Sequence, residues 1–533
     1  MGTGYSIQLT DNMRYGKRKP LFDFVCHAVN SGNATDAEKA NANAINYLKG
    51  KLEKYAGVSI SDLAKDKVSN PNLVIYPPDL TAYVDDVEKS CLFELPYVGG
   101  EFRIETGNLM GAFGIGDIKI SIGSRFDERP NKPYFMHYIL MKVLGLHVLN
   151  LPTHENYDPI DEFCIFLFPM VLKSALAKGL FKAYRRYEYN DANIKGAIDV
   201  ARHLRTSVPF RGRVAYVTRE HTADNPVLQL IRHAIEFIKA GPYCEILTAA
   251  DKDVKEAVDQ VVVATPTYMR QQRSKVIGQN LRPVRHPYFS EYTLLQKISL
   301  QILRHEKMSH GTGSNELAGV VFDGAWLWEE YLNKVMSESL NKAMNRESVE
   351  GNFGKLLHPR NKTGENQLYI YSPFRHPIYP DFLWRYAQLG DQNQEWDVVL
   401  DAKYKRAYKK DDKGKEHFAV VREDRFQMIS YMHLAKAKLG VIVCPMTENE
   451  TNAADNDSEG GFFKKEEGCY VEGDMLGHGG SIAVVPFVVP TARNNFEQYC
   501  EDMKKAEANY CYSLSKVIWS NVKSKEELSN SIQ

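Results

Sequence analysis

The chain has 533 residues, of which 44% are hydrophobic and 25% charged, as expected for a soluble protein of several domains. Lys plus Arg and Asp plus Glu each total 67, so the formal net charge is zero and any nucleic-acid-binding surface must be local. Eight scattered cysteines without a C-x-x-C pair argue against a zinc module and a disulfide scaffold. With no apolar leader and no apolar run long enough to span a bilayer, we expect a cytoplasmic protein without a membrane partner.

Residues 1–150 are predicted to form an α+β N-terminal domain that docks a partner. A capping-box pattern opens a helical run over residues 35–55, and short strands punctuated by glycines follow over 92–124. These glycines indicate hairpin turns rather than a phosphate loop, because the chain contains no G-x-x-x-x-G-K-[ST] pattern. We therefore expect that the chain binds no nucleotide and hydrolyses no NTP by itself.

Residues 151–310 are predicted to form a mostly helical middle region that faces DNA. Residues 163–187 fit one helical stretch that changes from apolar to basic. A second helix is predicted over 227–239, with Asp224 or Asn225 as its N-terminal cap.

Two segments of this middle region, 182–189 and 265–287, are rich in basic residues. Basic and aromatic residues side by side can follow a phosphate backbone. A solvated helix surface, or basic residues near the negative end of a helix dipole, explains the same patterns. Both interpretations remain open for both segments.

A Gly/Ser-rich connector at residues 305–315 predicts a domain boundary, and residues 316–533 are predicted to form the third domain. An aromatic helix is expected over 322–336. On it, Glu329 is the residue expected to reach a metal site, although a solvent-facing Glu is the alternative. Glu330 suits the solvent-facing position.

A predicted β-hairpin over residues 380–403 organises this third domain. Two apolar runs flank a polar turn, and a turn symmetric about Asp391 sets Asp381 opposite Asp401, with Cβ atoms about 5 Å apart. Strand alternation then places Asp401 and Lys403 on one face. A buried pair of carboxylates is costly without a cation, and hard oxygen ligands suit Mg²⁺, for which Mn²⁺ can substitute. The alternative is a surface hairpin with an ordinary Asp–Lys pair.

Such a site would carry out metal-assisted phosphodiester hydrolysis, with Lys403 orienting water or neutralising charge. Asp424, Gln427 and Tyr431 fall on one face of the next predicted helix, where the last two could support Lys403 or contact substrate. The alternative for them is a polar surface with the tyrosine packed inward.

The remaining elements complete an α/β core. Buried strands are predicted over 439–446 and 482–489, and a helix is predicted over 495–508. A Lys-rich loop at 405–415 and a mobile acidic insertion at 447–475 interrupt the domain. The last residues, 517–533, are expected to fray.

These residues resemble the PD-(D/E)xK nuclease motif and, more closely, the McrC-type nuclease subunit of McrBC (5-methylcytosine) modification-dependent restriction systems. The resemblance covers residues 160–490. It is carried by Leu327-Trp328-Glu329, Pro380-Asp381, Asp401-Ala402-Lys403-Tyr404, Asp424-x-x-Gln427-x-x-x-Tyr431, Lys195-Gly196-Ala197-Ile198-Asp199 and Thr222-Ala223-Asp224-Asn225.

The resemblance implies an α/β PD-(D/E)xK nuclease core and a Mg²⁺-dependent DNA endonuclease subunit that acts in phage defence. Such a subunit cuts double-stranded DNA when driven by a McrB-like AAA+ GTPase ring, whose GTP hydrolysis it stimulates. The implied catalytic residues are Asp381, Asp401, Lys403, Glu329, Gln427 and Tyr431, with Asp381, Asp401 and Glu329 as metal ligands. Two alternatives remain: a non-catalytic adaptor or regulator of the motor NTPase, and a stand-alone RecB-like repair nuclease.

Overall fold

The computed structural model of the chain describes most, but not all, of its residues. The described residues are 5–15, 50–65, 72–77, 90–98, 101–116, 118–127, 133–146, 159–308, 317–345, 355–358, 368–371, 375–385, 397–406, 408–410, 416–418, 422–451, 463–466, 469–472, 480–491, 493 and 495–531. Within them, no helix is long and apolar enough to cross a membrane. The helix predicted over 35–55 lies largely outside the described residues.

The N-terminal part is built on a five-stranded sheet with the order β1-β8-β7-β12-β3. Its strands are β1 (Tyr5–Thr10), β3 (Asn72–Tyr76), β7 (Leu109–Ile115), β8 (Ile118–Gly123) and β12 (Leu317–Asp323). The fourth strand in this order, β12, comes from much later in the chain and pairs antiparallel with β7 and parallel with β3. The predicted division into domains at residue 316 would assign β12 to the third domain; that division stays a prediction.

Small elements surround this sheet: β2 (Arg14–Tyr15), α3 (Ile60–Lys65), β4 (Tyr97–Val98), β5 (Glu101–Phe102) and β6 (Ile104–Glu105). The short strands predicted over 92–124 are thus confirmed. Gly116 has a φ of +63° between β7 and β8, which confirms that a glycine there serves a hairpin turn.

The middle part is a helical body. Its helices are α5 (Tyr134–Leu144), α6 (Pro159–Leu176), α8 (Pro226–Ala240), α9 (Glu245–Thr248), α10 (Lys252–Ala264), η3 (Arg270–Gln272), α11 (Arg273–Gln279) and α12 (Glu291–Met308). The predicted cap of α8 is confirmed, because the Asn225 side chain accepts hydrogen bonds from the N–H groups of Val227 and Leu228. Buried residues of these helices join those of both large sheets in one continuous apolar core.

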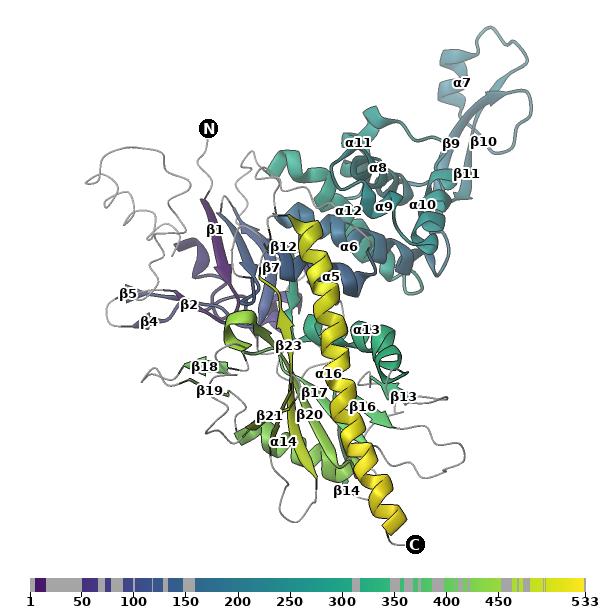
Figure 1. The fold of residues 1–533 in the computed structure, drawn as a ribbon. Helices are drawn as coiled ribbons and strands as arrows, with labels where there is room; N and C mark the ends of the chain where they lie inside the picture. Colours follow the sequence, from purple (N-terminus) through teal and green to yellow (C-terminus); the bar gives the residue numbers. More distant parts are fainter. Residues whose placement is uncertain are drawn as a thin grey trace.

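An arm projects from this helical body (Figure 1). It consists of the three-stranded antiparallel sheet β10-β11-β9 and one short helix: β9 (Ala183–Asp191), β10 (Ala197–Ile198), α7 (Val200–Thr206) and β11 (Val214–Thr222). The single helix predicted over 163–187 is therefore wrong in its second half. Gly179, with a φ of +93°, follows the end of α6, and exposure then alternates along β9 with the strand period of two.

The C-terminal part is built on a seven-stranded sheet with the order β13-β16-β17-β20-β23-β22-β21. Its strands are β13 (Lys355–Leu357), β16 (Phe382–Arg385), β17 (Val398–Ala402), β20 (Leu439–Thr447), β21 (Phe463–Glu466), β22 (Cys469–Glu472) and β23 (Ser481–Val489). Central strands β17, β20 and β23 are parallel, and the predicted buried strands over 439–446 and 482–489 are confirmed.

Helices cover both faces of this sheet. One face packs against α14 (Arg422–Ala435), and the other packs against α13 (Gly324–Asn345) and α16 (Phe496–Ser531), the long C-terminal helix in Figure 1. Two small hairpins lie beside it: β14 (Leu368–Tyr371) with β15 (Arg375–Ile378), and β18 (Tyr408–Lys410) with β19 (Glu416–Phe418).

Several predictions for this part need correction. The aromatic helix starts at Gly324 rather than at 322, because Phe322 belongs to β12. The helix predicted over 495–508 continues as α16 to Ser531, and Val517, Ile518 and Trp519, expected to fray, are buried. The Lys-rich loop predicted over 405–415 contains strand β18, which pairs with β19 just after it. The predicted acidic insertion contains β21 and β22, of which β22 pairs with β23.

Candidate active site

The predicted register of the central hairpin is confirmed. Strands β16 and β17 pair antiparallel, with Phe382 opposite Leu400 and Leu383 opposite Val399. Continuing this ladder by one residue sets Asp381 opposite Asp401. The turn between the strands, residues 386–396, lies outside the described residues.

Strand alternation directs Asp401 toward α14. Leu383 and Val399 pack in the apolar cluster beneath α14, and Asp401 lies two residues beyond Val399 on the same face of β17. Asp401 is 2% exposed, because the strand that carries it is central in the sheet. The structure thus places one carboxylate at the edge of a buried apolar layer, where its charge is poorly hydrated.

A chain of polar contacts leads from Asp401 to α14. Lys403 Nζ lies 2.8 Å from Asp401 Oδ2 and donates a hydrogen bond of 2.8 Å to Gln427 Oε1. Gln427 Nε2 in turn donates to Tyr431 Oη at 2.9 Å. The structure therefore brings together Asp401, Lys403, Gln427 and Tyr431. Asp424, on the same helix, pairs with Lys405 instead.

Asp381 is held at two points. Its Oδ2 accepts a hydrogen bond of 2.7 Å from the backbone N–H of Ala402. Its own carbonyl oxygen lies 2.9 Å from Nδ1 of His358, and because a carbonyl only accepts, that nitrogen carries the proton. The His358 ring also stacks on Phe382, at 4.9 Å between ring centroids. These contacts fix both the backbone and the carboxylate of Asp381.

The acidic pair on α13 lies beside this histidine. Glu329 Oε1 is 3.5 Å from His358 Nδ1, and Glu330 Oε1 is 3.4 Å from His358 Nε2. The Glu330 side chain is only 17% exposed, so the expectation of a solvent-facing Glu330 is wrong. The reason is a tertiary contact: β13 brings His358 against α13, which helical spacing alone does not reveal.

Burial and mutual repulsion shift the pKa values at this site. Burial, followed by repulsion from Asp401, raises the pKa of Asp381 to about 7. Burial, followed by Asp381 and Glu330, raises the pKa of Glu329 well above its usual range. Burial lowers the pKa of Lys403, but attraction to Asp401 and Asp381 outweighs it, and the pKa is raised overall. Such a concentration of negative charge favours a bound cation.

The donor set fits a hard divalent cation. Asp401 Oδ2 is buried and accepts no hydrogen bond of good geometry, although Lys403 Nζ lies 2.8 Å away. Among the described residues, no group of three or more His, Cys, Asp or Glu side chains is arranged to hold a metal ion, and the role of Glu329 as a ligand stays a prediction. Mg²⁺ commonly uses one or two carboxylates and keeps several waters, which two opposed aspartates satisfy.

The segment after Lys403 is fixed to the N-terminal sheet. Tyr404 Oη lies 2.7 Å from Ser124 Oγ at the end of β8, and its ring lies 5.0 Å from the Arg125 guanidinium. Arg406 Nη2 donates to the Arg125 carbonyl at 3.0 Å. The position of Lys403 therefore depends on both large sheets.

Sequence reasoning missed His358 and the closeness of Glu330 to it. His358 precedes Asp381 by 23 residues, and no spacing pattern joins them. Only the pairing of β13 with β16 brings the histidine to the aspartate.

The sequence matches the family described as McrBC 5-methylcytosine restriction system component over residues 104–445, well over half of the chain. The chain belongs to this family. The match confirms the McrBC resemblance, and it spans both Asp381–Asp401 and the α14 residues beside them.

Two solved structures of McrBC assemblies also align with this McrBC-family chain. A half-complex of Thermococcus gammatolerans McrB AAA+ hexamers with bound McrC contains a chain 15% identical, with a TM-score of 0.43, covering 96% of this chain and 100% of that chain. The Thermococcus gammatolerans McrBC complex contains one 13% identical, with a TM-score of 0.29, covering 65% of this chain and 89% of that chain. A search of curated proteins by sequence found no match.

Proposed function

We propose that this chain is the DNA-cutting subunit of a McrBC-type restriction system, a Mg²⁺-dependent endonuclease driven by an AAA+ GTPase partner. The observation that carries the proposal is the hairpin register that sets Asp381 opposite Asp401, with Lys403 beside them, in a chain of the McrBC family. On this proposal, residues 316–533 form a PD-(D/E)xK nuclease domain, 151–310 a DNA-facing middle region and 1–150 a partner-docking domain.

In this mechanism Asp381 and Asp401 would hold the metal, and Glu329, on the facing helix, would adjust the charge around it or add a ligand. Bound Mg²⁺ supplies charge stabilisation at the phosphoryl oxygen and a water of lowered pKa. Lys403, whose raised pKa keeps it protonated, neutralises the negative charge that develops on the phosphate and orients the attacking water. The reaction class is hydrolysis of a phosphodiester bond.

Gln427 and Tyr431 act through Lys403. The Gln427 carbonyl oxygen accepts from Lys403 Nζ, and Tyr431 Oη accepts from the Gln427 amide. A lysine carries three N–H donors on a flexible stem, so these contacts limit its orientations. We therefore assign both residues to positioning the lysine.

The proposed partner follows from the family and from the sequence. The family describes one component of a restriction system, and this chain contains no G-x-x-x-x-G-K-[ST] phosphate-binding pattern. A second chain must then supply the energy from nucleotide hydrolysis. We propose an AAA+ GTPase ring of the McrB class in that role.

The test is cleavage of methylated and unmethylated plasmid in Mg²⁺ by this chain, with and without the AAA+ protein encoded beside it and GTP. Cleavage that needs both partner and GTP, and that is lost in Asp401→Asn and Lys403→Ala, supports the proposal. Asp259→Asn and Lys504→Ala are the matched controls, since both residues are exposed and lie on other helices. We expect the controls to cut as fast as wild type.

Three other results would overturn the proposal. Faster GTP hydrolysis without any cleavage would make the chain an adaptor. Cleavage by the chain alone at full rate would indicate a stand-alone nuclease. Full cleavage by Asp401→Asn would place the chemistry elsewhere.

A further inference from the structure

One stretch of the helical body carries a local excess of positive charge. Between Asp259 and Glu291 the sequence contains no acidic residue and five basic ones, Arg270, Arg273, Lys275, Arg282 and Arg285. The chain as a whole has no net charge, so this excess is a local property of the surface.

The fold turns these charges outward. Helix α11 is fixed by Val276, which is buried, and by Asn280, whose Nδ2 donates to the Pro226 carbonyl at 2.8 Å. The loop after α11 is fixed in the same way, because Gln296 Oε1 accepts from the Val284 N–H at 2.8 Å. Four basic side chains of η3, α11 and the loop after it remain exposed, and we refer to this set as the basic surface: Arg270, Lys275, Arg282 and Arg285.

The charges of the basic surface are not neutralised internally. Among the described residues, none of these four side chains forms an ion pair or a hydrogen bond. Next to them, Arg273 has a buried Nε without a hydrogen-bond partner. Unpaired guanidinium and ammonium groups on a fixed backbone are what a phosphate chain requires, since each can accept a phosphate without first breaking a salt bridge.

The other basic segment, 182–189, differs in this respect. Arg185 Nη1 lies 3.4 Å from Asp224 Oδ1, and Arg186 Nη2 lies 3.8 Å from Asp199 Oδ2. Both arginines therefore already have carboxylate neighbours. Of the two segments that the sequence left open as phosphate-binding surfaces, the structure favours 265–287.

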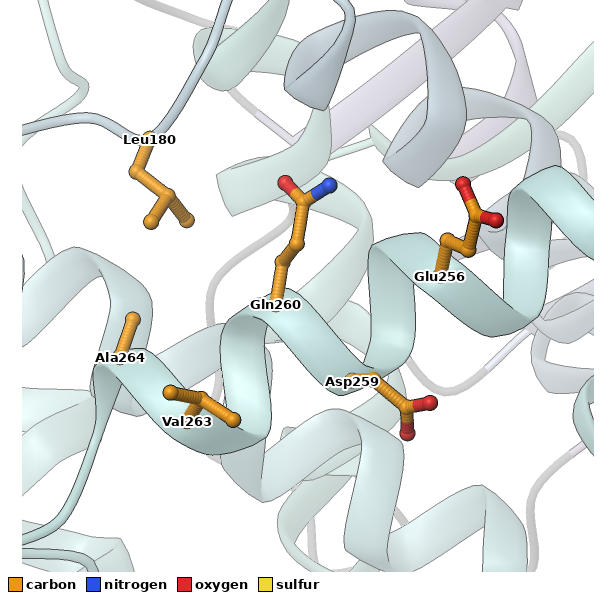
Figure 2. Close-up of a pocket in the computed structure, with 6 residues that line it drawn as sticks. All are labelled: Leu180, Glu256, Asp259, Gln260, Val263 and Ala264. Carbon is orange, nitrogen blue, oxygen red and sulfur yellow. The ribbon is translucent and has the colours of Figure 1, made fainter.

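A groove on helix α10 is lined by acidic rather than basic residues. Figure 2 shows Glu256, Asp259 and Gln260 on its wall, with Val263 and Leu180 as apolar neighbours. Glu256 Oε1 lies 3.6 Å from Lys252 Nζ, and Asp259 adds a second carboxylate, so the groove lacks the excess positive charge that would attract a phosphate. The groove is therefore not part of the surface that we consider for phosphate binding.

We propose that the basic surface binds the phosphodiester backbone of double-stranded DNA, an inference that rests on the proposed endonuclease function. In Figure 1, α11 lies far from β16 and β17, which carry the candidate active site. The surface thus contributes affinity without taking part in the reaction, and it holds the DNA at a second point on the chain.

The test is the salt dependence of binding, measured by fluorescence anisotropy with a short labelled duplex and the full chain in EDTA. Each phosphate contact contributes about 0.9 to the slope of log K against log salt. Replacing the four residues of the basic surface with Gln should reduce this slope by about 3 to 4, and binding at low salt should weaken by roughly tenfold or more. A variant with Arg270→Lys, Arg282→Lys and Arg285→Lys should keep the wild-type slope, because it keeps the charge.

The matched control removes four exposed lysines elsewhere, Lys252, Lys255, Lys504 and Lys505, also by Gln. Equal slopes for this control and the basic-surface variant would overturn the proposal, and so would a wild-type chain that does not bind duplex in EDTA. Unchanged DNA binding with lost association to the AAA+ protein would assign the surface to a protein partner and also overturn it. Binding and cleavage separate the two proposals. If the wild-type chain binds DNA through the basic surface but never cuts it, the nuclease proposal fails and this one stands. Asp401→Asn should bind DNA like wild type, because it leaves the basic surface intact.

Discussion

His358 is the residue that most directly sets the geometry of Asp381. One ring nitrogen contacts the Asp381 carbonyl at 2.9 Å, and the other faces Glu330 at 3.4 Å. Residues that orient a metal ligand in this way typically change metal affinity or activity by about 10- to 100-fold when removed. On the proposed mechanism, the histidine would therefore influence cleavage by positioning Asp381, without touching the reacting atoms.

We predict that His358→Phe lowers the Mg²⁺-dependent cleavage rate and the affinity for Mn²⁺ by about tenfold or more. His358→Asn should retain most of both, because its amide N–H can take the place of Nδ1–H. Cleavage assays and Mn²⁺ titration followed by electron paramagnetic resonance measure the two effects. His376→Asn is the control, since His376 is exposed and has a φ of +54°, which Asn tolerates. Wild-type affinity in the Phe variant would refute the role.

A second prediction concerns pH. The pKa of Asp381, raised to about 7 by burial and by Asp401, exceeds the value of about 4 of an unfolded chain. Without metal, this group therefore favours folding when protonated, and its contribution is lost as pH rises from about 4 to about 7. Mg²⁺ should restore stability at the upper end of this range, and apparent Mg²⁺ affinity should fall below about pH 7.

Thermal unfolding of wild type and Asp381→Asn at a series of pH values, in EDTA and in Mg²⁺, measures this effect. The Asn variant should show a smaller metal-free decline than wild type, because Glu329 still contributes, and it should lack most of the metal-dependent recovery. Parallel pH profiles for the two proteins would contradict the assignment of the raised pKa to Asp381.

At the scale of elements, local signals decided which predictions succeeded. Helix α8 has a capping residue and β20 an uninterrupted apolar run, and both lie where expected. The register of β16 with β17 was also predictable, because it depends only on a turn within one hairpin. Two of the site's charged groups, Asp401 and Lys403, therefore lie on the face that the sequence indicates.

Elements whose form depends on distant partners were not predictable. Strand β9 mixes basic and aromatic residues, a composition that also fits a helix end, and only pairing with β11 decides between the two. Val517, Ile518 and Trp519 of α16 have weak local signals, and they are buried in the core that residues of α13 also join. For the same reason, no sequence pattern brought His358 to Asp381.

At the scale of the whole molecule, one buried carboxylate of α16 links this helix to α5 and α13. Glu507 accepts hydrogen bonds from Tyr138 Oη on α5 at 2.9 Å and from Tyr331 Oη on α13 at 3.0 Å. Lys142 Nζ lies 3.3 Å from its second oxygen. Removing this carboxylate would leave two buried hydroxyls without an acceptor.

We predict that Glu507→Ala lowers the free energy of unfolding by roughly 3 kcal/mol, since hydrogen bonds to a charged group contribute about 1.5 to 3 kcal/mol each and do not add fully. Glu507→Gln should cost less, because its amide oxygen still accepts. Urea denaturation of the full chain measures the difference. Glu501→Ala, at an exposed position of the same helix, is the control, and an equal loss in both Ala variants would contradict the prediction.

The position of β12 in the sheet limits how early the N-terminal sheet can form during synthesis. It lies between β7 and β3, and in the described residues β3 pairs with no other strand. When the ribosome has made only the first 316 residues, the N-terminal sheet lacks β12, and β3 has no partner strand. The sheet closes only once residue 323 has left the exit tunnel, and α13, with Glu329 and Glu330, follows directly. A gene split at the connector would therefore yield two fragments, neither of which contains a complete N-terminal sheet.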